Sequence, residues 1–276
     1  MPTACQGLSV RTASLTVPSG DSLSIENSQI IYTGYNTSQC QTNSATGEMT
    51  CSEQKNTAPT LIFYGHDLEG VQIASGTLTI ESGAILQCTG RNCSTVAATG
   101  SSVINIHGSI IAEGTGSEVI TGNAGNDTVH LYGGASVTGD IDLGSGMNEI
   151  YFSSPVTFDG NIILSSPQIK LSNGRNSLLV SIYTINGVYQ VQVTDSRAYT
   201  RIYTQDPTLT TTTLDGQTIS SSTLVIPIDL DGNGKDDMVV YRNNVLNKIA
   251  LKISPALLTT NFLHHSHNGG HPESVL

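Results

Sequence analysis

Short hydrophobic runs separated by turn residues recur along most of the chain. Within a run, apolar and polar residues alternate, as in Leu15-Thr-Val17, Leu78-Thr-Ile80 and Val103-Ile-Asn-Ile106. Alternation with a period of two indicates a strand that buries one face. No segment of helix length carries the spacing of an amphipathic helix. The pattern therefore predicts an all-β protein.

The runs also repeat at a fixed distance, and two separate alignments give the same period of 21 residues. A unit of that length made of short strands predicts one coil, stacked on the next through a parallel ladder about 4.8 Å apart. We expect a right-handed parallel β-solenoid (β-helix) that begins near the N-terminus, because residues 14–25 and 76–86 are variants of one unit. The matched positions are Gly139, Ile141 and Leu143 with Gly160, Ile162 and Leu164, and Gly125, Thr128 and Val129 with Gly146, Glu149 and Ile150.

The pattern predicts three parts along the chain. Residues 1–195 form the solenoid, with the polar segment 34–59 as a loop that leaves one coil. Residues 196–262 form a small antiparallel β module with strands at 224–228, 238–241 and 249–253. Residues 263–276 form a flexible, His-rich tail.

The composition of the chain limits the classes of binding partner that we expect. The net charge is −11 and no Lys/Arg cluster could neutralise a row of phosphates, so nucleic acid is not an expected partner. An acidic, hydroxyl-rich surface supplies oxygen ligands for hard cations such as Ca²⁺. No apolar run reaches the roughly 18 to 20 residues of a membrane helix, and the first residues lack the features of a signal peptide. We expect contact with a membrane only through an anchor outside this sequence.

All five cysteines lie in the first third of the chain. No Cys-x-x-Cys pair or nearby His suggests zinc, and Cys40 with Cys51 and Cys88 with Cys93 each enclose a short polar loop. We expect these two disulfides and an unpaired Cys5, with free thiols as the alternative, because sequence alone does not fix connectivity. Disulfides favour a secreted protein at the cell surface.

The segments Gly122-Asn-Ala-Gly-Asn-Asp-Thr-Val129 and Gly139-Asp-Ile-Asp-Leu-Gly-Ser-Gly146 carry a family resemblance. They resemble repeat units of bacterial autotransporter passenger domains and related β-helical adhesins, which implies a β-helix at a cell surface and a link to virulence. Gly122 to His130 also resembles the nonapeptide of repeats-in-toxin calcium β-rolls, which implies Ca²⁺ at Asp127. Those nonapeptides follow one another directly, whereas the related segment here follows after 21 residues. We expect a plain solenoid turn at Asp127.

The strongest chemical signal is an acidic loop in the C-terminal part. Asp229, Asp231, Asn233 and Asp237 place side-chain oxygens at loop positions 1, 3, 5 and 9, and Lys235 offers its backbone carbonyl. Alternate residues of such a loop can converge on one cation, so we predict that it binds calcium. The flanking strands make it similar to the calcium loop of FG-GAP-type repeats in extracellular proteins, although one copy alone implies no propeller.

Two weaker groups of titratable residues remain. His264, His265, His267 and His271 could share Zn²⁺ or Ni²⁺, but polar tails often carry His without a role. The set His66, Asp67 and Glu69 is interpreted as a polar turn rather than a catalytic group.

Together these features favour a non-enzymatic, extracellular surface protein. We expect an adhesin or structural stalk, stabilised by calcium, that attaches to a host or sister-cell surface through a glycan or protein, or associates with itself into an oligomer or filament. The alternative is a polysaccharide lyase or hydrolase on a β-helix, which needs paired carboxylates or a basic group beside Ca²⁺ ligands. A third interpretation is a pore-forming or toxin passenger.

Overall fold

A computed structural model of the chain describes its central part nearly without interruption. Every described element is a β-strand, and among these residues no helix is long and apolar enough to cross a membrane. The all-β prediction is therefore confirmed for this part of the chain. The described residues are 3–5, 15–17, 22–26, 29–33, 41–42, 49–50, 60–64, 67–153, 155–173, 177–205, 211–214, 217–220, 224–228, 237–243 and 248–254.

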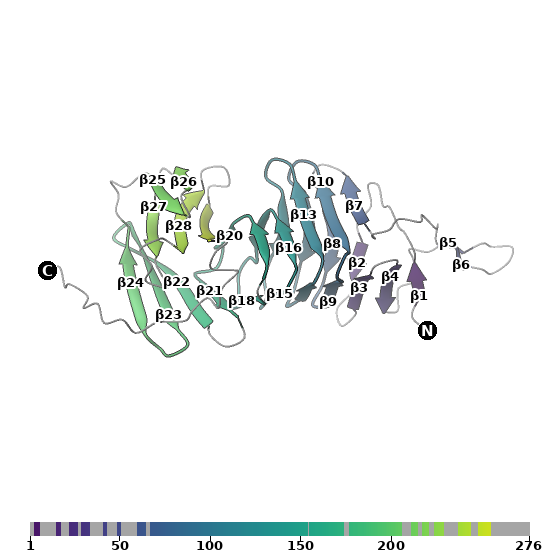
Figure 1. Cartoon of the computed structure of the whole chain (residues 1–276), viewed down its shortest axis with the longest axis horizontal. Helices are drawn as coiled ribbons and strands as arrows, with labels where there is room; N and C mark the ends of the chain where they lie inside the picture. The colour runs from purple at the N-terminus through teal and green to yellow at the C-terminus, as the bar shows by residue number, and fades with distance from the viewer. Residues whose placement is uncertain are drawn as a thin grey trace.

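Three sheets run along an elongated body (Figure 1). Sheet A has eleven strands in the order β1 (Thr3–Cys5), β4 (Gln29–Thr33), β3 (Ser22–Glu26), β9 (Thr77–Ile80), β12 (Val103–Ile106), β15 (Thr128–Leu131), β18 (Asn148–Phe152), β21 (Gln168–Ser172), β22 (Ser177–Ile185), β23 (Val188–Asp195) and β24 (Thr200–Thr204). Sheet B has nine in the order β2 (Leu15–Val17), β8 (Glu69–Ile73), β11 (Ser94–Ala98), β14 (Glu118–Gly122), β17 (Asp140–Asp142), β20 (Ile162–Ile163), β29 (Lys248–Ile253), β28 (Met238–Asn243) and β27 (Leu224–Ile228).

The remaining strands form sheet C and two separate hairpins. Sheet C has five strands in the order β19 (Thr157–Asp159), β16 (Ser136–Thr138), β13 (Ser109–Glu113), β10 (Ile85–Thr89) and β7 (Thr60–Tyr64). Two hairpins stand apart from these sheets, β5 (Gln41–Thr42) with β6 (Met49–Thr50) and β25 (Thr211–Leu214) with β26 (Gln217–Ser220).

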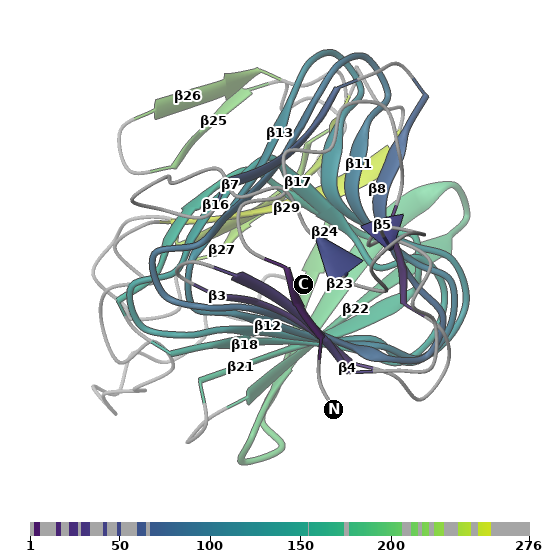
Figure 2. The ribbon, with the colours of Figure 1, turned by 90° about the vertical axis from the view of Figure 1, so that its right-hand side faces the viewer.

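The chain winds through the three sheets in turn, which makes the body a parallel β-solenoid. It passes through β7 in sheet C, β8 in sheet B and β9 in sheet A, and the next coil repeats this order with β10, β11 and β12. Each strand pairs in parallel with its counterpart one coil away. Viewed along the long axis, the coils superimpose around one interior (Figure 2). The predicted solenoid is confirmed.

The predicted period holds in the later coils only. Val129 pairs with Ile150 and Ile141 pairs with Ile162, both 21 residues apart. Earlier coils are longer, because Ile85 pairs with Ser109 and Ser109 with Ser136, which are 24 and 27 residues apart. The strands keep their register while the turns between them change length. A search for a strict period therefore finds only the later coils.

The N-terminal strands join the same ladders. Leu23 and Ile25 of β3 lie beside Leu78 and Ile80 of β9, in parallel. β2 pairs with β8, so the segment 15–17 stacks on 71–73. The solenoid therefore includes residues near the N-terminus, as predicted.

One continuous apolar interior holds the coils together. The inward positions of successive sheet A strands are fully or almost fully buried, for example Ile104, Val129 and Ile150. Each such side chain contributes roughly 1.5–3 kcal/mol when buried. Close stacking also requires glycine where coils touch through their turns. Gly146 has φ of +125° and a Cβ there would overlap the carbonyl oxygen of Gly125 one coil away.

Antiparallel strands continue two of the sheets beyond the last coil. β22, β23 and β24 form a meander that extends sheet A from β21, and β29 pairs with β20 to extend sheet B through β28 and β27. The antiparallel strands predicted at 224–228, 238–241 and 249–253 are confirmed. The division of the chain at residues 195 and 262 stays a prediction.

Candidate functional site

The predicted calcium loop lies almost wholly outside the described residues. Of its five ligands, Asp229, Asp231, Asn233 and Lys235 are not described, and Asp237 is. Asp237 is buried directly before β28, where its carbonyl oxygen accepts a hydrogen bond from the backbone N–H of Ser254 at 2.8 Å. The calcium site stays a prediction, as does any metal at the C-terminal histidines, which also lie outside the description. Within the described residues, no three His, Cys, Asp or Glu side chains are grouped to hold a metal ion.

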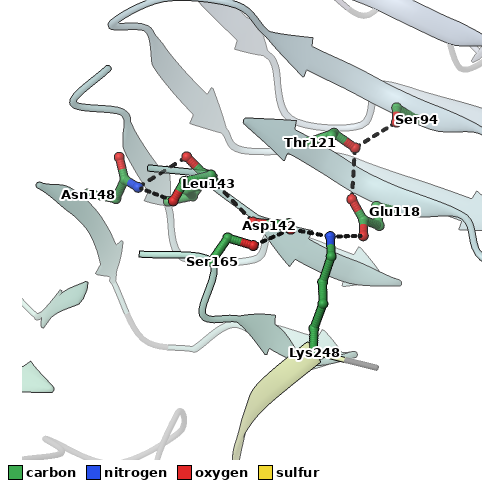
Figure 3. Close-up of polar contacts among 9 residues, drawn as sticks. Ser94, Glu118, Thr121, Asp142, Leu143, Asn148, Ser165 and Lys248 are labelled. Carbon is green, nitrogen blue, oxygen red and sulfur yellow. Dashed lines mark hydrogen bonds and ion pairs between the residues drawn. The ribbon is translucent and has the colours of Figure 1, made fainter. Parts of the chain in front are cut away.

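A group of polar contacts lies on the outer side of sheet B, where the C-terminal strand β29 meets the solenoid (Figure 3). Lys248 extends from β29 so that its Nζ lies 2.6 Å from Asp142 Oδ2 on β17 and 3.5 Å from Glu118 Oε1 on β14. We call these three residues the Lys248 cluster. The two carboxylates are nearly buried, with 4% and 10% of their side chains exposed, whereas Lys248 is 41% exposed.

Neighbouring groups fix both carboxylates in place. Asp142 accepts hydrogen bonds from the Gly144 backbone N–H at 2.9 Å and from the Ser165 hydroxyl at 2.8 Å. The Thr121 hydroxyl donates to Glu118 Oε2 at 2.9 Å and in turn lies 2.6 Å from the hydroxyl oxygen of Ser94. The cluster therefore joins several coils of sheet B to a strand that lies 106 residues from Asp142 in sequence.

Burial and charge act against each other in this cluster. Burial raises the pKa of Glu118 above its ordinary value and outweighs the lowering effect of Lys248. Burial alone would lower the pKa of Lys248, but the hydrogen bond to Asp142 and the two carboxylate charges raise it. The resting form of Lys248 at neutral pH is thus the ammonium ion.

That charge state decides what the cluster can do. An eliminating enzyme needs an unprotonated base facing the sugar, and acid-base hydrolysis needs two carboxylates free to face one sugar. Here both carboxylates hold the same ammonium group. The arrangement favours a structural anchor between solenoid and C-terminal strands over a catalytic site. A second contact supports the anchor, since the Tyr241 hydroxyl on β28 donates to Asn161 Oδ1 at 2.6 Å.

A different surface lies on the outer face of sheet A, on the strands at the bottom of Figure 2. Four rings gather there and are called the ring cluster: His107, His130, Tyr132 and Tyr151. His107 and Tyr132 stack with centroids 3.9 Å apart, and His130 lies 4.9 Å from Tyr151 and 5.8 Å from Tyr132. All four are partly exposed. Burial lowers the pKa of His130, against the raising effect of the nearby Glu149 carboxylate.

Polar residues and then apolar ones continue this outer face. Glu149 beside the ring cluster forms an ion pair with Lys170 at 2.9 Å. Farther along, β22 to β24 leave several large side chains exposed to solvent. These side chains are Leu179, Tyr183, Ile185 and Ile202.

The predicted disulfide between Cys88 and Cys93 is confirmed. It joins β10 to the residue directly before β11 across one corner of the solenoid, and both cysteines are fully buried. The side chains of Cys5, Cys40 and Cys51 lie outside the described residues.

Two other predicted sites resolve as turns. Asp67 has φ of +52° before β8 and accepts a hydrogen bond from the Asn92 side chain at 2.8 Å, in line with the predicted polar turn. His66 is not described. Asp127 is fully buried and accepts the Ser102 backbone N–H at 2.8 Å, with no group of metal ligands around it in the described part of the chain.

Sequence reasoning missed both the Lys248 cluster and the ring cluster. Lys248 stands at the start of an apolar run, and nothing in that run names a partner in β14 or β17. The ring cluster had a usable signal, because His130 and Tyr151 are separated by the 21-residue period and so lie side by side. Comparison of this chain with family models, curated proteins and solved structures gives no match.

Proposed function

We propose that this protein acts outside the cell as a surface adhesin or structural stalk, and that the outer face of sheet A is its attachment surface. The observation that carries the proposal is a contrast between two clusters. The ring cluster lies partly exposed on a sheet with regular parallel pairing, whereas the charged groups of the Lys248 cluster bind one another. Repeated coils hold such a face rigid, so ligand groups spaced along it can bind together.

The partner we propose is a glycan or protein on a host or sister-cell surface. Aromatic rings with hydroxyl and imidazole edges suit neutral sugars or protein surfaces, because they combine apolar contact with hydrogen bonding. The net charge of −11 disfavours polyanions such as nucleic acid. The confirmed corner disulfide supports an oxidising, extracellular location. Calcium at the acidic loop would stabilise the C-terminal strands.

The test is attachment of purified protein to fixed cells and to an array of neutral and acidic polysaccharides, with light scattering to follow self-association. We expect saturable attachment or concentration-dependent association that weakens with excess EDTA. A monomer that attaches to nothing in either condition would contradict the proposal. Depolymerisation of any polysaccharide on the array would instead support the alternative, a lyase or hydrolase on a β-helix.

A further inference from the structure

The Lys248 cluster has a geometry that goes beyond an ordinary ion pair. The amine nitrogen of Lys248 lies 2.6 Å from one carboxyl oxygen of Asp142, and a second carboxyl group, that of Glu118, lies 3.5 Å from the same nitrogen. Another ion pair on the solenoid, Lys170 with Glu149, has a single carboxylate, and both of its side chains are more exposed than the two acids of the cluster.

We propose that Lys248 and Asp142 become joined by an amide bond between their side chains, with Glu118 carrying the proton. The Lys248 nitrogen, as a neutral amine, attacks Asp142 Cγ while Asp142 is protonated. The new N–C bond forms as one carboxyl C–O bond breaks. Glu118 takes a proton from the nitrogen and delivers it to the leaving oxygen, which departs as water. Glu118 ends unchanged, and no oxidant or other reactant is needed.

The starting ion pair can reach the reactive form without a net change in charge. One proton moves from the Lys248 ammonium to a carboxylate that is 4% or 10% exposed, and a low-dielectric site favours such a neutral pair over two separate charges. The neutral form is a minor one, since the pKa of Lys248 is raised at rest. The reaction is therefore expected to be slow, on the scale of protein maturation.

Position accelerates the condensation. Groups held in contact by a fold react as if present at about 10⁵–10⁸ M. The fold holds both acids through Gly144, Ser165 and Thr121. Lys248 is held by β29, whose backbone pairs with β20 of the last coil.

The consequence is a covalent link between the solenoid and its C-terminal strands. The bond would close a loop between residues 142 and 248 and fasten β29 to β17, so that a pulling force could not peel the C-terminal strands from the last coil. This goes beyond attachment itself, because a protein with no adhesive role could carry the same bond.

The test is the intact mass of the purified full chain, after reduction of its disulfides and incubation at neutral pH. We expect a mass lower than that of the sequence by one water, about 18 Da, and a proteolytic peptide that joins the segments around Asp142 and Lys248. Lys248→Arg keeps the ion pair but should have the full mass. Asp142→Asn should lose ammonia, about 17 Da, because the amide nitrogen is then the leaving group.

Two further variants separate the proposed chemistry from other dehydrations. Glu118→Gln should slow the mass loss strongly, whereas Lys170→Arg, the matched control on the exposed pair, should leave it unchanged. Circular dichroism shows whether each variant folds. Full mass in the folded wild-type protein after prolonged incubation would overturn the proposal. A water loss that persists in Lys248→Arg would overturn it as well, because that loss would come from cyclisation elsewhere in the chain.

Discussion

Asp142 and Asp127 are both buried in the solenoid, and their surroundings differ sharply. Asp142 on sheet B has a cation, a hydroxyl and a backbone N–H around it, from Lys248, Ser165 and Gly144. Asp127, in the turn before β15, has one backbone N–H on Oδ1, while Oδ2 has no partner. Burial raises the pKa of Asp127 to about 6. One buried acid thus contributes to stability at neutral pH and the other reduces it.

The difference follows from where each residue lies. Asp142 faces the outer side of sheet B, where the antiparallel strand β29 can bring a lysine. Asp127 lies in a turn packed between coils, where its backbone N–H donates to the Asn148 side chain at 2.9 Å. The Asp127 carboxylate therefore accepts a backbone hydrogen bond there, but no described Lys or Arg pairs with it.

The largest expected effect comes from removing the cation beside Asp142. Lys248→Met leaves two nearly buried carboxylates without it, and we expect a loss of about 2–3 kcal/mol of unfolding free energy, below the range for fully buried pairs because Lys248 is 41% exposed. Denaturant unfolding measures it. Lys170→Met, on the exposed pair, should cost less than about 1 kcal/mol. Equal losses in the two variants would show that the Lys248 cluster is no anchor.

Substitution of Asp127 should instead increase the unfolding free energy, by an amount that depends on pH. The folded pKa of about 6 lies above the ordinary value of 3.8, so the folded state binds the proton more tightly. Stability from this group is therefore fully present below about pH 4 and is lost as pH rises through 6. Asp127→Asn should gain about 2–3 kcal/mol relative to wild type between pH 4 and pH 7. Thermal melts at several pH values measure it, and a constant difference between the two proteins would contradict the account.

A third acidic group, the predicted calcium loop, should stabilise only when a cation is present. At a ten-fold excess of Ca²⁺ over its Kd we expect about 1.4 kcal/mol of added stability. Melts with Ca²⁺ and with EDTA measure this gain, and Asp231→Ala should abolish it. Lys235→Ala is the matched control, because Lys235 is predicted to contribute only its backbone carbonyl. If Ca²⁺ left the melting temperature unchanged, the proposed stabilisation by calcium would be wrong.

The smallest effect on stability is expected on the outer face of sheet A. Tyr132→Ala removes a ring stacked on His107 at 3.9 Å, which should cost about 1 kcal/mol or less because both rings are partly exposed. Denaturant unfolding of this variant beside Lys248→Met compares the two faces directly. A larger loss than that of Lys248→Met would mean that the ring cluster is chiefly structural.

The sequence was sufficient to predict the solenoid, because inward positions such as Val129 and Ile150 must repeat with the coil if one interior is to be continuous. The antiparallel C-terminal strands and the disulfide between Cys88 and Cys93 were also predictable, from local alternation and short loop length. These features depend on residues close in sequence or on a simple period.

The Lys248 cluster could not be predicted in the same way. It depends on how β29 joins sheet B, which brings residues 106 apart into contact and obeys no period. The long coils escaped notice for a related reason, since their turns vary in length while their strands keep register. On coils of unequal length, a cluster of rings can be found from the sequence only after the coils have been aligned by their buried residues.

The central claim is that the outer face of sheet A is the attachment surface. The most direct measurement is the attachment of the double variant Tyr132→Ala with Tyr151→Ala to whichever cell or polysaccharide the wild-type protein binds. Tyr199→Ala is the matched control, because Tyr199 is 57% exposed and lies outside the ring cluster. The account predicts that the double variant folds and loses at least ten-fold in affinity while the control binds like wild type. Undiminished attachment by the folded double variant would contradict it.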